Sequence, residues 1–206
     1  MSTALQLAIT TIGDLLLGST ISKNAEGKPL SSINLVIPPY QRPYKWTTKN
    51  VVQLLDDIIE AKNQNKETYR VGTLILHYET AKGTYNMVDG QQRRITFSLL
   101  LLALNENEGK NIPFLNQCLT DEVHNARNIP NNYRTLERRI HTIADSRERN
   151  ELYDYIKNNC ELIVVITEDI SEAFQFFDSQ NARGKKLYPH DLLKAYHLRE
   201  MNHLDT

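Results

Sequence analysis

The sequence predicts an α+β domain in which a β-hairpin forms part of a small sheet surrounded by several helices. Short runs of β-branched and aliphatic residues, which are typical of strands, occur at 33–37, 71–78, 84–88 and 161–167. Longer segments between them carry apolar residues at helical spacing. The chain has 206 residues and 40% hydrophobic content, as an ordinary globular protein does, and we expect one domain over 1–206.

The first element is expected to be a short helix. Thr11 and Asp14 have the spacing of a capping box, and Gly18 follows a run of leucines and stops the helix. The apolar run at 33–37 then predicts a strand, which Pro38 must end because proline cannot donate a hydrogen bond to a sheet.

A longer helix and a hairpin follow. The helix is expected to begin near Asn50, after a threonine cap, because apolar residues then recur on one face. Its core-facing residues are Val51, Leu54, Leu55, Ile58 and Ile59. The runs at 71–78 and 84–88 are joined by a turn at Lys82-Gly83, so they predict a β-hairpin.

The second half of the chain is predicted to be mainly helical. The segment 95–104 is apolar nearly all round, which indicates a buried helix that holds the preceding loop rigid. Asp169 and Glu172 have capping-box spacing and open a further helix. The remaining expectations are helices at 133–141, 148–158 and 191–201, a strand at 161–167, and an end near 181–184 for the helix that Asp169 opens.

The charge balance bears on nucleic-acid binding. A formal net charge of −1 excludes a basic surface over the whole molecule, so any DNA contact must use a local patch and should weaken as salt rises. Five arginines gather between residues 134 and 149, namely Arg134, Arg138, Arg139, Arg147 and Arg149. Because Glu137, Glu148 and Glu151 are interleaved with them, a solvated face laced with salt bridges is a better account than a DNA surface.

Several other classes of protein are disfavoured. No apolar run is long enough to span a membrane and no signal segment is recognisable, so we expect a cytoplasmic protein without membrane contact. Cys118 and Cys160 lie far apart without a CxxC pattern, which argues for reduced thiols and against structural zinc. No two histidines have metal-ligand spacing, and the sequence contains no Walker-type phosphate loop.

The loop Asp89-Gly90-Gln91-Gln92-Arg93 carries the most suggestive chemistry. It joins a predicted strand to a predicted helix, and helix N-termini bind anions through free N–H groups and the helix dipole. Gly90 lets the backbone approach a ligand, and the two glutamine amides offer donors and acceptors. Arg93 matches phosphate oxygens, and Asp89 suits Mg²⁺. The alternative is an ordinary cap and turn without a binding function.

The aromatic loop at 40–46 has two interpretations. It forms a recognition surface, with an arginine bound to phosphate and aromatic rings stacked on a base, or its rings plug the core. The residues assigned to recognition of DNA or phosphate are Tyr40, Gln41, Arg42 and Tyr44.

A third loop, at the end of the helix that Asp169 opens, also has two interpretations. Asn181, Arg183 and Gly184, followed by two lysines, suit a second clamp on a nucleotide. Alternatively, Gly184 is only the left-handed residue that ends the helix.

Three segments carry a resemblance to a known family. They are 37–46 (Ile-Pro-Pro-Tyr-Gln-Arg-Pro-Tyr-Lys-Trp), 88–93 (Val-Asp-Gly-Gln-Gln-Arg), and 177–187 running into 191–194. In this order the chain strongly resembles the N-terminal domain of the GmrSD-type restriction endonucleases, a bacterial group marked by the DGQQR motif. The likeness runs from Thr11 to about Lys194. Three motifs in the right order indicate membership more strongly than one would.

The resemblance implies a fold and a role. The fold would be a ParB/sulfiredoxin-like small mixed sheet with a β-hairpin, surrounded by several helices, with its core at about 11–194. The DGQQR loop would bind a nucleoside triphosphate, with Mg²⁺ as cofactor. The role would be defence against phage or foreign DNA that carries a modification. The family's cleavage chemistry usually sits in a C-terminal His-Asn-His type nuclease domain. We expect that domain to be absent here, and cleavage to need a nuclease domain or subunit elsewhere.

The site residues implied fall into two sets. For catalysis, Asp89 would hold the metal, and Gln91 or Gln92 would orient the attacking water. Arg93, with Arg42 or Arg183, would stabilise charge on the transferring phosphoryl group. The nucleotide-binding set is Gly90, Arg94, Asn181, Arg183 and Gly184. The alternative function is a regulatory module that senses nucleotide or DNA without turnover.

Overall fold

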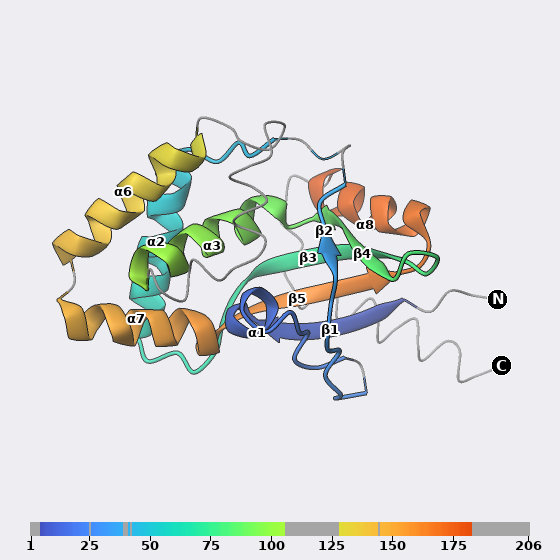
Figure 1. Ribbon diagram of the computed structural model, residues 1–206, viewed down its shortest axis with the longest axis horizontal. Coiled ribbons are helices and arrows are strands. Elements are labelled where there is room, and N and C mark those ends of the chain that lie inside the picture. Colours follow the sequence, from blue (N-terminus) through green and yellow to red (C-terminus); the bar gives the residue numbers. More distant parts are fainter. Residues whose placement is uncertain are drawn as a thin grey trace.

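The protein contains a mixed open β-sheet with helices on both faces. The computed structural model describes residues 5–24, 26–38, 41, 43–105, 128–143 and 145–182. In this part of the chain, five strands lie in the order β1-β5-β3-β4-β2 (Figure 1). They are β1 (Gln6–Thr11), β2 (Leu35–Val36), β3 (Tyr69–Glu79), β4 (Thr84–Asp89) and β5 (Cys160–Thr167). The predicted α+β class, with a small mixed sheet that includes a hairpin, is confirmed.

The strands pair in both directions. β1 is antiparallel to β5, and β3 is antiparallel to β4 in the predicted hairpin. β3 is parallel to β5, and β2 is parallel to β4. A parallel pair needs a crossover connection. The chain between β4 and β5 supplies one, and it contains the helix that follows the polar loop.

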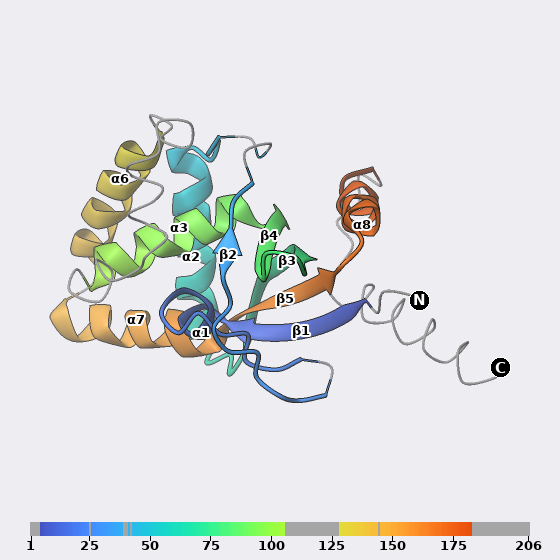
Figure 2. The ribbon, with the colours of Figure 1, turned by 45° about the vertical axis from the view of Figure 1, so that its right-hand side comes forward.

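The helices cover the two faces of the sheet unequally. α8 packs on one face, and the other described helices gather on the opposite face (Figure 2). The bounds are α1 (Ile12–Leu16), α2 (Thr48–Asn63), α3 (Gln91–Leu104), α6 (Asn128–Ile143), α7 (Ser146–Asn159) and α8 (Ile170–Ala182). Over the residues that the structure describes, no helix has the length and apolar character that a membrane crossing requires.

Alternation along the strands explains the two layers. Neighbouring side chains of a strand point to opposite faces of the sheet. In β5, Leu162 and Val164 join the larger core beneath the helix group, whereas Ile163 lies in the smaller core with Ala173 of α8. β5 is therefore apolar on both faces, as the continuous apolar run predicts for a buried strand.

The predicted helix starts are confirmed by their caps. The Thr11 side chain accepts a hydrogen bond from the Asp14 N–H at 3.0 Å, which caps α1. Thr47 is the N-cap of α2. The Asp169 carboxylate accepts from the Ser171 N–H at 2.7 Å and the Glu172 N–H at 3.3 Å at the start of α8. α8 ends at Ala182, as expected.

Two expectations about strands are corrected. The first element is β1, which precedes the short helix that was expected to come first. Residues 6–11 pair with β5 from Gln6↔Ile166 to Thr11↔Glu161, so their strand structure depends on partners far along the chain. The strand expected at 33–37 is only Leu35–Val36, because β4 pairs with these two residues alone. The helix predicted at 191–201 lies outside the described residues.

One of the two cysteines can be placed. Cys160 is a free, fully buried thiol at the start of β5. Burial raises its pKa to about 12, because the charged thiolate is poorly solvated there. Cys160 therefore behaves as a small core residue rather than a reactive thiol. Cys118 lies outside the described residues.

Candidate functional site

A pocket of about 250 Å³ lies where β4 passes into α3. Asp89 is the last residue of β4, Gly90 is the N-cap of α3, and Gln91 is its first helical residue. The described residues that line the pocket are Gln41, Val88, Asp89, Gln91, Gln92, Phe174 and Phe177. The polar loop predicted from the sequence therefore forms part of the pocket, and α8 contributes two aromatic side chains.

Gly90 brings the loop close to β3. Its φ of +100° lies in the region that favours glycine. A Cβ at this position would lie 2.7 Å from Leu74 Cδ1 and 3.3 Å from the Thr73 carbonyl oxygen. Only glycine meets both requirements, so Gly90 sets how tightly the loop packs on the sheet.

The N-terminus of α3 has no side-chain cap. The N-cap is glycine, and the first backbone hydrogen bond of the helix runs from the Arg94 N–H to the Gly90 carbonyl at 3.0 Å. The N–H groups of Gln91, Gln92 and Arg93 therefore have no hydrogen-bond partner among the described residues. Such groups, together with the positive end of the helix dipole, attract an anion.

The two glutamines of the loop differ in their contacts. Gln91 is 3% exposed, and neither its amide nitrogen nor its amide oxygen has a hydrogen-bond partner. Gln92 is tied to the aromatic loop, because its Oε1 accepts from the Lys45 N–H at 2.7 Å and the Trp46 N–H at 3.2 Å. Gln91 is thus the glutamine whose amide makes no hydrogen bond in the described part of the structure.

The two arginines that follow do not line this pocket. Successive residues of a helix are turned by about 100°, so Gln91 and Arg93 point in nearly opposite directions. Arg93 lies over β3 at Gly72, where a Cβ would be 2.7 Å from Arg93 Nε and 2.8 Å from its Cζ. Among the described residues, no carboxylate forms an ion pair with Arg93. Arg94 is buried, with 7% exposure.

The described part of the aromatic loop contributes one residue to the pocket and one to the core. Gln41 lines the pocket and donates from Nε2 to the carbonyls of Met87 and Val88, at 2.9 and 2.8 Å. Tyr44 is fully buried, which agrees with the core plug rather than with DNA recognition. Tyr40 and Arg42 lie outside the described residues.

A buried polar cluster holds Tyr44 in place. Its hydroxyl lies 2.7 Å from Thr96 Oγ1, and Asn132 Nδ2 donates to it at 3.1 Å. Burial raises the pKa of Tyr44, so its hydroxyl stays protonated at neutral pH. The loop thereby joins α3 to α6 beside the pocket.

The third predicted loop can be placed only in part. The backbone of Asn181 lies in the last turn of α8. Arg183 and Gly184 lie outside the described residues. The second clamp on a nucleotide therefore stays a prediction.

The pocket suits a metal that arrives with its ligand. Asp89 is the one carboxylate among the described lining residues. Over the same part of the chain, no group of three His, Cys, Asp or Glu residues is placed to hold an ion. Mg²⁺ is usually bound by one or two carboxylates together with water and substrate phosphates. The donor set fits Mg²⁺ bound in this way.

Phe174 and Phe177 were not expected to be site residues. Both lie in the helix that Asp169 was expected to open, where phenylalanines three residues apart usually face a core. Phe174 is 39% exposed, which is unusual for a large apolar side chain. No sequence signal distinguishes a phenylalanine that lines a pocket from one that fills a core.

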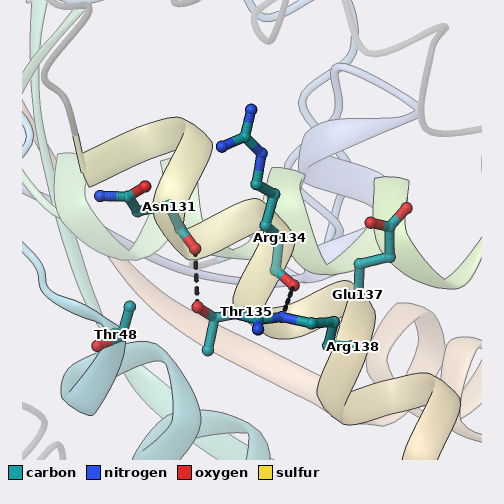
Figure 3. Close-up of a pocket in the computed structure, with 6 residues that line it drawn as sticks. All are labelled: Thr48, Asn131, Arg134, Thr135, Glu137 and Arg138. Atoms are coloured by element: carbon teal, nitrogen blue, oxygen red, sulfur yellow. Dashed lines mark hydrogen bonds between the residues drawn. The ribbon is translucent and has the colours of Figure 1, made fainter.

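A second hollow, of about 560 Å³, lies between α6 and the start of α2. Its described lining is Thr48, Asn131, Arg134, Thr135, Glu137 and Arg138. Figure 3 shows the Arg134 side chain extending away from α6, while Arg138 lies back along the helix. Arg138 Nε donates to the Arg134 carbonyl at 3.3 Å, and the Thr135 hydroxyl to the Asn131 carbonyl at 2.8 Å.

The interpretation of the arginines as a face laced with salt bridges is right for only part of the set. Arg139 pairs with Asp56 at 3.2 Å, and Arg147 with Glu151 at 3.0 Å. Arg134 and Arg138 are exposed and form no ion pair with any described carboxylate. They therefore add two positive charges to the second hollow, where Glu137 supplies one negative charge. The interleaved glutamates did not reveal this, because spacing along a helix does not determine which charges meet.

Comparison with known proteins agrees with the three motifs. A family model described as "GmrSD restriction endonuclease, N-terminal domain" matches residues 17–198. This range includes every described residue that lines either hollow. No curated protein matches the chain.

Proposed function

We propose that this chain, which belongs to the family of GmrSD restriction endonuclease N-terminal domains, binds a nucleoside triphosphate with Mg²⁺ at the start of α3 and hydrolyses it. The observation that carries this proposal is the uncapped N-terminus of α3. Its first-turn N–H groups face no protein acceptor among the described residues. An anion at that point would gain hydrogen bonds and a favourable field together.

Charged side chains support the same ligand. Arg93, within the first turn of α3, has no acidic partner among the described residues and adds positive charge near the N–H groups. Asp89 lines the pocket directly before the helix and would hold Mg²⁺. When bound, the metal would neutralise charge that develops on the transferring phosphoryl group. The chain itself would position the triphosphate through backbone donors and Arg93.

Membership of the family supports a role for this chain as a component of a restriction system. It also supports DNA and a nuclease as partners. We infer that hydrolysis here is coupled to recognition of modified DNA, and that cutting is performed by a nuclease domain or subunit elsewhere. The alternative is a regulatory module that senses nucleotide or DNA without turnover.

Phosphate release decides between these functions. The purified chain is incubated with Mg²⁺ and each nucleoside triphosphate, with and without modified plasmid DNA. We expect phosphate release that Asp89→Asn abolishes, and plasmid that stays supercoiled. Nucleotide binding without phosphate release would favour the sensing module. Plasmid nicking lost in Asp89→Asn would place a nuclease centre in this chain and contradict the division of labour.

The second hollow is the best candidate for a DNA contact. Arg134 and Arg138 lie one turn apart on α6, neither forms an ion pair with a described carboxylate, and together they outweigh the one negative charge of Glu137 in the hollow. Thr48 and Thr135 add hydroxyl groups, which also bond to phosphate oxygens. We therefore assign contact with the DNA backbone to this surface, in place of the solvated face expected from the sequence.

Removing this charge should weaken DNA binding. The logarithm of the DNA-binding constant falls linearly with the logarithm of the salt concentration, and each phosphate contact adds about 1 to the steepness of this slope. The double variant Arg134→Gln/Arg138→Gln is therefore expected to reduce the steepness by about 2. Fluorescence anisotropy of a labelled duplex at several salt concentrations measures the slope. The control Arg139→Gln/Arg147→Gln removes the same net charge from residues that are paired with carboxylates. Equal slopes for the two double variants would rule out a specific contact at the hollow.

A further inference from the structure

The amide of Gln91 is unusual among the described side chains. Gln91 lines the pocket, and only 3% of its surface is exposed. Neither polar atom of its amide has a hydrogen-bond partner. Burying polar atoms without partners is unfavourable, and most native structures avoid it. A ligand that bonds to both atoms would remove this cost.

The two atoms make opposite demands on a ligand. Gln91 Nε2 donates hydrogen bonds, whereas Oε1 accepts them. Phosphate oxygens carry little hydrogen at neutral pH, so a phosphate group satisfies Nε2 alone. The edge of a nucleobase offers a donor beside an acceptor, and a glutamine amide can bond to both, as it does with adenine in DNA. Gln91 therefore suits the edge of a base better than it suits a phosphate.

The rest of the pocket suits the flat face of the same group. Phe174 and Phe177 of α8 line it, and Phe174 is 39% exposed. Buried Val88 adds an apolar surface. Aromatic side chains bind bases by stacking. The cavity of about 250 Å³ lies below the range of about 300–1,000 Å³ that is usual for a whole ligand, so it suits one part of a nucleotide.

We infer that this pocket is a base-binding subsite, in which the base of the nucleoside triphosphate stacks on Phe174 and its edge pairs with the Gln91 amide. The triphosphate then extends to the uncapped start of α3. Gln91 would select the nucleotide rather than orient the attacking water. This inference rests on the proposed function, because it assigns a place to one part of the proposed ligand.

A comparison of the affinities for nucleoside triphosphates and for inorganic tripolyphosphate tests the inference. Tripolyphosphate carries the phosphate groups without a base. Calorimetry should find that Phe174→Ala weakens binding of the preferred nucleoside triphosphate by about 5- to 150-fold, the range for loss of one stacking contact. The affinity of the Phe174→Ala variant for tripolyphosphate should stay within about twofold of that of the unaltered protein, a change well below the effect of one lost stacking contact. Gln91→Glu, which replaces a donor by an acceptor, should change the order of affinity among the four nucleotides.

Two controls separate binding from folding. Ile170→Ala removes a side chain of α8 that is 37% exposed, nearly the same as Phe174, but does not line the pocket. It should leave every affinity unchanged. Phe174→Tyr keeps the ring and should restore nucleotide binding.

The outcomes distinguish the two proposals. Equal weakening of nucleotide and tripolyphosphate binding by Phe174→Ala would overturn the base subsite and leave the phosphate site intact. A Gln91→Glu variant that lowers hydrolysis of all four nucleotides equally, with the order of affinity unchanged, would also overturn it. If neither nucleotides nor tripolyphosphate bind to the unaltered protein, the proposed function fails together with the inference.

Discussion

Gly90→Ala is expected to lower the free energy of unfolding by about 2–5 kcal/mol. An alanine at φ +100° strains the backbone by about 1–2 kcal/mol. The new methyl group would also lie 2.7 Å from Leu74 Cδ1, and Leu74 is only 1% exposed, so it has little room to move. Overpacking of this kind typically costs about 1–3 kcal/mol. Equilibrium unfolding in urea, followed by circular dichroism, measures the change.

Gly83→Ala is the matched control for this substitution. Gly83 also has a positive φ, of +62°, but a Cβ there would meet nothing within 4 Å. Its cost should be limited to the backbone strain of about 1–2 kcal/mol. If both variants lose the same stability, the close approach of Gly90 to β3 is not what holds the loop in place.

Arg93→Ala is expected to weaken nucleotide binding by about 2–5 kcal/mol, which is about 30- to 5,000-fold in the dissociation constant. The reason is that a phosphate bound at the start of α3 would lose a first-turn cation that forms no ion pair with a described carboxylate. Removing one member of a desolvated charge pair leaves the other without compensation. Calorimetric titration with each nucleoside triphosphate measures the loss.

Arg70→Ala controls for the loss of positive charge. Arg70 is exposed on β3, two residues before the glycine over which Arg93 lies. Its removal changes the net charge equally but should change nucleotide affinity by less than about twofold, as is usual for exposed charges. Unchanged affinity in a folded Arg93→Ala protein would show that the triphosphate does not bind at the start of α3.

Local signals accounted for most element boundaries. The caps at Thr11, Thr47 and Asp169 lie where the sequence predicts them, because the hydrogen bonds of each cap join groups only two or three residues apart in the chain. The hairpin turn at 82–83 is local in the same way. Interactions of this range are encoded in a few adjacent residues, so they can be identified without knowledge of the fold.

The edge strands show where local signals fail. β1 was missed and β2 was predicted too long. A strand completes its backbone hydrogen bonds with a neighbouring strand, so its extent depends on the partner as much as on its own residues. β1 pairs with β5, which lies more than a hundred residues later in the chain, and no short segment contains that information.

Some features of the candidate site were likewise predictable from local sequence, and others depend on the tertiary structure. The sequence by itself determined the family and a polar, glycine-containing loop between a strand and a buried helix, because these depend on residues that are adjacent in the chain. Only the tertiary structure decided that Gln91 faces a pocket, that Gln92 binds the aromatic loop and that Arg93 lies over β3. It also decided that α8 brings Phe174 to the same pocket. These outcomes depend on which distant segments pack around the first turn of α3, and no short stretch of sequence contains that information.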